Sequence, residues 1–158
     1  MSNFTSPNPS QDERVIAALA HVSAILPFMG VIAPIVIWVT QREKSRYVAF
    51  QALQAVAYQL TMIVAWMIGM GCYFCSFFAT FLSIPMVSSS GTTPAGNALA
   101  ELGFIIPFLS LGVIFLVVLA FIVYGIVGAI NVFQGKPFRY VFIGYRVERF
   151  MQQEENKS

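Results

Sequence analysis

Charged residues are scarce in this 158-residue chain: Asp, Glu, Lys and Arg make up 10% of it, whereas hydrophobic residues make up 58%. A soluble globular domain carries about 25% charged residues. No charged residue lies between Arg46 and Glu101, and none lies between Glu101 and Lys136. A chain of this length has too little interior to bury such runs, which excludes an ordinary soluble domain. The composition therefore predicts an integral membrane protein whose solvent is the lipid bilayer.

Residues that particular classes of function require are also missing. Cys72 and Cys75, the two cysteines, lie in an apolar run, which excludes a secreted disulfide scaffold. We expect both to be buried packing residues with inert thiols. A net charge of +2 without a basic stripe predicts no nucleic-acid partner. Because the chain has no nucleotide loop, no cluster of metal ligands and no nucleophile beside a base, it predicts neither an enzyme nor a cofactor.

Polar ends flank the apolar part of the chain. We predict a disordered polar tail over residues 1–14, a single transmembrane helical domain over 15–151 and a second polar tail over 152–158. Within the domain, a first apolar block over 15–39 has enough residues for one span but is interrupted from Pro27 to Gly30. This block is either one bent helix that crosses the membrane or two short helices that form a hairpin.

Two further apolar blocks follow. The second covers 47–87, where Pro85 marks its end, and the third covers 102–133 and is the clearest transmembrane helix. Beyond it, residues 138–151 alternate large apolar residues with arginine, which is typical of a segment in the membrane interface. The sequence therefore predicts an all-α polytopic membrane protein, a bundle of three to four membrane helices with a C-terminal interfacial segment.

The loop between the second and third blocks, 88–97, is polar and contains no Lys or Arg. A helix should begin within 94–98, with Thr93 or Asn97 as its N-cap. By the positive-inside rule, the basic loop at 40–46 and the basic region after 133 lie in the cytoplasm, and the C-terminus lies there as well. The residues expected to anchor this face are Arg42, Lys44, Arg46, Lys136, Arg139, Arg146 and Arg149.

Three glutamines begin the second block on one helical face: Gln51, Gln54 and Gln59. Intramembrane amides require partners, so this stripe either forms hydrogen bonds between helices of the bundle, which we favour, or lines a partner-binding seam. His21, the only histidine, is expected to be a hydrogen-bonded structural residue. Asn131 and Gln134 are predicted to continue the same network. Close helix packing is predicted at small residues four positions apart, namely Ala65 with Gly69 and Gly125 with Ala129.

Four stretches, at 13–23, 32–38, 45–55 and 135–140, resemble a family of small bacterial membrane proteins of unknown function that includes the MamF-type magnetosome proteins. This resemblance implies a multi-pass protein of the bacterial inner membrane. The family in turn is distantly similar to the twenty-kilodalton Tic subunit of the chloroplast import machinery. That resemblance implies four helices with both termini on one side, which favours the hairpin. It implies nothing about activity.

These features predict a non-enzymatic membrane protein that assembles with or supports another membrane complex, either a different membrane protein or further copies of this chain. The alternative is a component of an oligomeric pore or protein-translocation system, which rests on the Tic resemblance alone. A membrane enzyme, built from His21, Ser23 and Glu101, is the weakest reading. The 88–97 loop contains no acidic residue, and for that reason the sequence does not favour a mineral-related role.

Overall fold

The computed structural model describes residues 8–26, 28–89 and 93–155, and these ranges contain helices and no strand. The contacts divide the chain into two compact units, which are described separately. The first unit contains Met1–Ile63 and Ala120–Ser158, and the second contains Val64–Leu119. The predicted all-α class is therefore confirmed, while a single domain over 15–151 stays a prediction.

Helix α1 (Gln11–Val22) begins with a complete capping box. The Ser10 hydroxyl accepts a hydrogen bond from the Glu13 amide at 3.2 Å, and the Glu13 carboxylate accepts one from the Ser10 amide at 2.8 Å. These two bonds satisfy donors that a helix start otherwise leaves unpaired. The predicted C-terminal boundary of the polar tail, residue 14, is therefore wrong, because α1 already begins at Gln11. Residues 1–7 lie outside the described residues.

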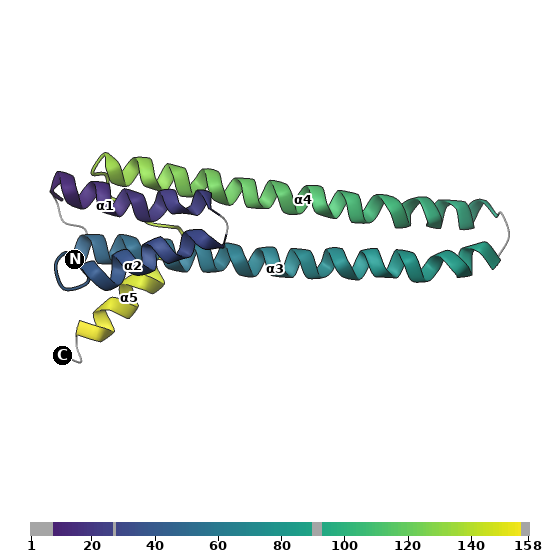
Figure 1. The fold of residues 1–158 in the computed structure, drawn as a ribbon, viewed down its shortest axis with the longest axis horizontal. Coiled ribbons are helices and arrows are strands. Elements are labelled where there is room, and N and C mark those ends of the chain that lie inside the picture. Colours follow the sequence, from purple (N-terminus) through teal and green to yellow (C-terminus); the bar gives the residue numbers. More distant parts are fainter. Residues whose placement is uncertain (1–7, 27, 90–92, 156–158) are drawn as a thin grey trace. The chain divides into compact units, whose positions relative to one another are not determined.

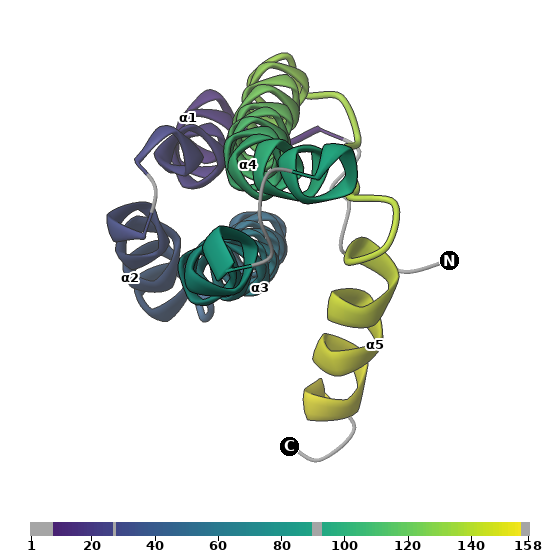
Figure 2. The ribbon, with the colours of Figure 1, turned by 90° about the vertical axis from the view of Figure 1, so that its right-hand side faces the viewer.

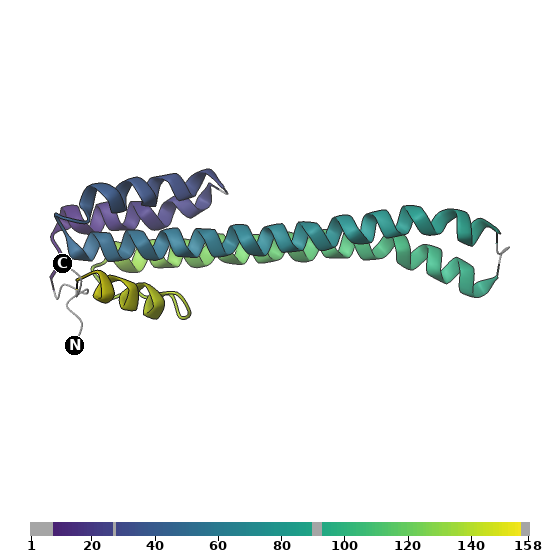
Figure 3. The same ribbon diagram turned by 90° about the horizontal axis from the view of Figure 1, so that it is seen from below.

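The first apolar block forms a hairpin, as the family resemblance suggested. Helix α1 packs against α2 (Ile32–Gln41). The two short 3-10 turns between them, η1 (Ser23–Ile25) and η2 (Met29–Val31), also contact each other (Figures 1 and 3). Phe28 has a φ of 67°, and a Cβ on Gly30 would lie 2.0 Å from the Ser23 carbonyl oxygen, so this reversal requires glycine there. The bent single helix is therefore wrong.

Within the part of the chain that the structure describes, two helices are long and apolar enough to cross a membrane: α3 (Arg46–Ser89) and α4 (Pro94–Phe133). Pro85 lies inside α3, so the predicted end of the second block at this proline is wrong. The amide of Gly96 donates to the Thr93 hydroxyl at 3.2 Å, which confirms Thr93 as the cap of α4. Residues 90–92 of the predicted loop lie outside the described residues. A count of three to four spans remains a prediction.

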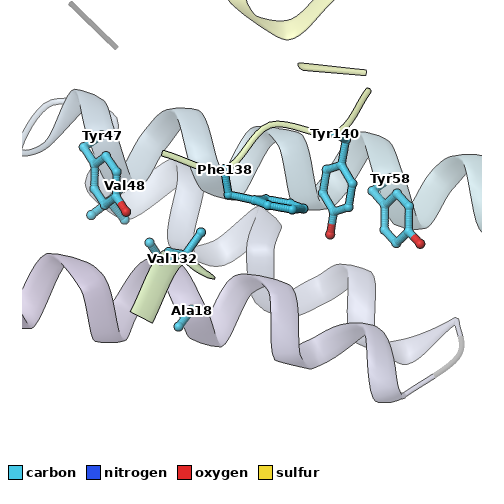
Figure 4. Close-up of a cluster of buried hydrophobic side chains, with 8 residues drawn as sticks. Ala18, Tyr47, Val48, Tyr58, Val132, Phe138 and Tyr140 are labelled. Carbon is cyan, nitrogen blue, oxygen red and sulfur yellow. The ribbon is translucent and has the colours of Figure 1, made fainter. Parts of the chain in front are cut away.

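The core of the first unit lies between the α1–α2 hairpin and the long helices. Its largest buried cluster contains aromatic and aliphatic side chains from α1, α3, α4 and the segment that follows α4 (Figure 4). Figure 2 shows the hairpin on one side of this unit and helix α5 (Gly144–Glu155) on the other. The buried members of the cluster are Ala17, Ala18, Tyr47, Val48, Tyr58, Val132, Phe138 and Tyr140.

After α4, the chain turns at Gly135, whose φ is 73°, and continues without a helix through residue 140. Phe138 and Tyr140 point from this segment into the core (Figure 4). Helix α5 then packs Val147 against Phe50 of α3. Because α5 continues to Glu155, the predicted tail at 152–158 begins too early, and residues 156–158 lie outside the described ones. An interfacial position for 138–151 remains a prediction.

The second unit consists of the remaining parts of α3 and α4. Gly69 lets α3 approach α4, because a Cβ there would lie 3.0 Å from Ile114. Thr80 adds a hydrogen bond from its hydroxyl to the Gly103 carbonyl at 2.7 Å. Cys72 and Cys75 are exposed, so the expectation that they are buried is wrong. Many large apolar side chains share this exposure, which a surrounding lipid phase would make favourable.

Candidate functional site

The glutamine stripe on α3 lies entirely within the first unit. Gln51 and Gln54 have no exposed surface, and Gln59 is 2% exposed. Buried amides are costly unless their donors and acceptors are paired, so the partners of these side chains define what the site can do. They come from α1, from η1 and from the segment after α4.

His21 connects α1 to this stripe. Its Nε2 lies 3.2 Å from Gln51 Oε1, and its Nδ1 lies 3.0 Å from the Tyr140 hydroxyl. An amide oxygen can only accept, so Nε2 carries the proton and Nδ1 accepts the hydrogen bond from Tyr140. Burial lowers the pKa of His21 to about 4, with the hydrogen bond to Gln51 acting in the opposite direction. The imidazole is therefore neutral at physiological pH.

Gln51 and Gln54 extend the network to the segment after α4. The Gln51 amide donates to the Phe138 carbonyl at 3.3 Å, and the Gln54 amide donates to Gln51 Oε1 at 3.4 Å. The Gln54 carbonyl oxygen in turn accepts from the Tyr140 backbone amide at 3.1 Å. Three parts of the chain that are distant in sequence are thus tied together by side-chain hydrogen bonds. We name His21, Gln51, Gln54 and Tyr140 the polar core.

Gln59 makes a separate connection to the hairpin. Its amide donates to the Ser23 hydroxyl at 2.9 Å, and this hydroxyl donates to the Ala20 carbonyl at 2.8 Å. Ser23 is therefore engaged by Gln59 and by the end of α1, while His21 is engaged by Gln51 and Tyr140. The predicted enzyme reading has His21 and Ser23 acting together, and these separate partners do not support it.

Aromatic rings border the polar core. Tyr58 stacks on Tyr140 with 4.0 Å between ring centroids and donates its hydroxyl to the Phe121 carbonyl at 2.8 Å (Figure 4). Tyr124 meets Tyr140 edge-on at 5.3 Å. Tyr140 therefore contributes a hydroxyl, a backbone amide and a ring face. Sequence reasoning missed its role, although Tyr140 closes one of the stretches that carry the family resemblance.

A second set of hydrogen bonds joins the start of α1 to the start of α3. The Ser45 hydroxyl donates to the Glu13 carboxylate and accepts from the Val48 amide at 3.3 Å. Hydrogen bonds from the Ser45 hydroxyl and the Ser10 amide lower the pKa of Glu13 below its usual value. The nearby Tyr47 hydroxyl is buried without a hydrogen-bond partner among the described residues.

The predicted anchoring residues all belong to the first unit and differ in their surroundings. Arg139 forms an ion pair with Glu148 at 2.9 Å and lies over the Phe50 ring at 5.9 Å. Arg149 donates to the Tyr145 hydroxyl. Arg42 lies 3.8 Å from Glu43. Three further anchoring residues, Lys44, Lys136 and Arg146, are exposed on the surface of the protein. Their position on the cytoplasmic side of a membrane remains a prediction.

The small residues predicted for helix packing are found at close approaches, with one exception. A Cβ on Gly125 would lie 3.0 Å from Ala24, Ala129 is 3% exposed, and Gly69 faces Ile114. Ala65 is only partly buried. Asn131 donates within its own helix to the Val127 carbonyl at 2.8 Å, and Gln134 is exposed. The prediction that Asn131 and Gln134 continue the network is therefore wrong.

The hydrogen bonds of the polar core connect α1, α3 and the segment after α4. The polar core holds a neutral histidine whose two nitrogens are both engaged, and no group of three potential metal ligands occurs among the described residues. Such networks rigidify the fold when every member is satisfied. We therefore regard the polar core as the element that fixes the hairpin and the segment after α4 against α3.

Comparison with known proteins gave one match. The model of a family described as the magnetosome magnetite crystal formation protein family, MamF/MmsF, matches residues 12–147. This range includes the polar core, Ser45 and the basic residues from Arg42 to Arg146. No curated protein and no solved structure matches the chain. The predicted resemblance to MamF-type proteins is confirmed, while the resemblance to the Tic subunit stays a prediction.

Proposed function

Because the chain belongs to the magnetosome magnetite crystal formation protein family, we propose that it is a non-enzymatic membrane protein of a mineral-forming compartment. It would act by assembling with or supporting another membrane protein there. The acid-free loop at 88–97 made a mineral-related role unattractive on sequence alone, and the family match reverses that preference. The family's description names crystal formation and not a chemical reaction.

This proposal rests on the observation that the side chains of the polar core are buried and hydrogen-bonded within the protein. His21, Gln51 and Gln54 are fully buried and bonded to one another and to Tyr140, so their chemistry serves the fold. Large apolar side chains dominate the exposed surface instead. A protein of this kind influences its surroundings through its surface, which is how an accessory subunit acts in a membrane complex.

The proposed location is a bacterial inner membrane or a compartment continuous with it, with the C-terminus in the cytoplasm. The uneven distribution of Lys and Arg supports this orientation. The hairpin places the start of α1 and the start of α3 at the same end of the first unit, where Ser45 bonds Glu13. The N-terminus would then face the cytoplasm as well. A reporter fused to each terminus tests this orientation.

Co-purification tests the proposed assembly. The full chain, tagged at its C-terminus in a magnetosome-forming bacterium, would be extracted with a mild detergent and its companions identified. We expect one membrane protein at a near-equal amount, absent when an unrelated tagged membrane protein of similar size is extracted. A strictly solitary particle, together with normal crystals in a deletion strain, would refute the proposal.

Residues of the polar core disfavour the alternative of an oligomeric pore. A polar lumen would require Gln51 and Gln54 to face water, yet both side chains are fully buried and bonded within one chain. Flux through purified protein in liposomes, reduced when both become leucine but not when the exposed Gln152 becomes leucine, would favour the pore over the accessory role.

A further inference from the structure

An apolar groove runs along the first unit where the turn before α5 meets the long helices. Two adjoining cavities of about 470 and 680 Å³ form it, and they share Thr61, Phe142 and Ile143 as lining residues. These volumes lie in the range of cavities that hold small molecules. We name the two cavities together the lateral groove.

Three hydroxyl groups along the lateral groove are already engaged inside the protein. The Thr61 hydroxyl donates to the Ala57 carbonyl at 2.8 Å, and the Tyr58 hydroxyl donates to the Phe121 carbonyl at the same distance. The Tyr140 hydroxyl bonds His21. The groove therefore offers carbon surface to an occupant, and apolar chains match it best.

Arg146 introduces a positive charge at the edge of this groove. It lines the larger cavity and is exposed, and among the described residues it makes no hydrogen bond or ion pair. Its neighbours differ, because Arg139 pairs with Glu148 and Arg149 bonds Tyr145. A cation on a flexible stem beside an apolar surface can place its head at the level of lipid headgroups.

The turn beside the groove has the exposure expected of a segment in contact with lipid. Phe142 is 87% exposed and Val141 is 77% exposed, although both are large apolar residues. Water would make this exposure unfavourable, whereas acyl chains would not. Phe142 and Arg146 both line the larger cavity, so the apolar turn and the cation border the same groove.

We propose that the lateral groove and Arg146 form a binding site for one phospholipid with an anionic headgroup. The acyl chains occupy the two cavities, and the guanidinium of Arg146 contacts the lipid phosphate, a geometry to which arginine is well suited. The proposal is independent of the assembly proposed above, because it concerns the purified chain and its lipid.

Native mass spectrometry of the full protein, released from mild detergent, tests the site. The probes are phosphatidylglycerol and phosphatidylcholine of equal chain length, added in a titration. We expect one phosphatidylglycerol to bind in preference to phosphatidylcholine. Arg146→Gln should weaken the binding of phosphatidylglycerol about five-fold, as expected for the loss of one membrane-adjacent cation. The control Arg149→Gln removes an arginine that already bonds Tyr145 and should leave this preference intact.

A second variant tests the apolar part. Thr61 lines both cavities and is exposed, so Thr61→Phe should fill the groove and reduce binding of both lipids. Elution as a single peak and an unchanged unfolding midpoint would show that the variant folds. Equal binding of the two lipids, undiminished binding by Arg146→Gln or Thr61→Phe, or occupation of the groove by a second copy of the chain would each overturn the proposal.

Discussion

The hydroxyl of Tyr140 lies 3.0 Å from Nδ1 of His21, although 119 positions separate the two residues in the sequence. One residue belongs to the first helix and the other to the segment after the last long helix. Their hydrogen bond therefore closes the first unit, and Gln51 completes the connection through α3. The polar core is a structural element whose contribution to stability can be measured directly.

Tyr140→Phe should destabilise the protein by about 1–3 kcal/mol, because it removes the donor to His21 and leaves a buried acceptor unpaired. The ring and its stacking on Tyr58 remain, so the change isolates the hydroxyl. The control is Tyr145→Phe, which removes an exposed hydroxyl that accepts from Arg149 and should cost well under about 1 kcal/mol. Equilibrium unfolding in detergent compares the two variants, and equal midpoints would contradict this role.

Removing His21 and Gln51 together should cost less than the sum of the single changes. Gln51→Leu leaves the His21 Nε2 proton and the Phe138 carbonyl without partners, whereas the double variant with His21→Leu removes one of these penalties. A double-mutant cycle of unfolding free energies measures the coupling, which we expect to be about 1 kcal/mol or more. Strict additivity would show that the two side chains do not interact in the folded protein.

Much of the polar core was predictable from α3 and little of it from the rest of the chain. The spacing of Gln51, Gln54 and Gln59 placed them on one helical face and required partners. Tyr140 was not predictable, because it lies 86 positions beyond Gln54 in a segment without helical periodicity. Contacts of such sequence separation leave no local pattern.

Other differences between prediction and structure have local physical causes. Pro85 was read as a helix end, yet prolines are tolerated inside membrane helices because neighbouring groups compensate for the lost hydrogen bond. Cys72 and Cys75 were placed inside because their run is apolar on all sides. Such a run has no polar face from which to deduce the buried one. The residues of the first apolar block could not decide between a hairpin and a bent helix, because its prolines permit both. The hydrogen bond between Gln59 and Ser23, which are distant in sequence, distinguishes them.

Stability should decrease as the pH falls from about 6.5 toward 4, because of His21. Its pKa is lowered to about 4 in the folded protein, whereas an unfolded histidine titrates near its ordinary value of about 6.5. Between these values the unfolded state binds a proton that the folded state does not, so the slope is at most about 1.4 kcal/mol per pH unit. Above the unfolded pKa, both states are neutral and His21 contributes no pH dependence.

Unfolding midpoints in detergent at several pH values test this prediction, with His21→Leu as the comparison. The variant should lose the slope between pH 6.5 and 4.5 while keeping a decline at lower pH. Glu13 accounts for that remaining decline, because its pKa is lowered and the stability it contributes is lost as the carboxylate becomes protonated. An identical pH profile for the two proteins would show that His21 is charged or solvated in the folded state.

Gly30→Ala should prevent the hairpin from closing, because the added Cβ would lie 2.0 Å from the Ser23 carbonyl oxygen and 3.1 Å from the Gln59 side chain. The first contact involves backbone, which cannot move without breaking η1, so we expect a loss of several kcal/mol or failure to accumulate. Gly71→Ala is the matched control. Apart from its chain neighbours and the adjacent backbone of its own helix, no atom lies within 4 Å of the added Cβ. Alanine also favours a helix over glycine by about 1 kcal/mol. Accumulation in membranes and the unfolding midpoint compare the two variants, and equal behaviour would mean that Ser23 and Gly30 are farther apart than the structure places them.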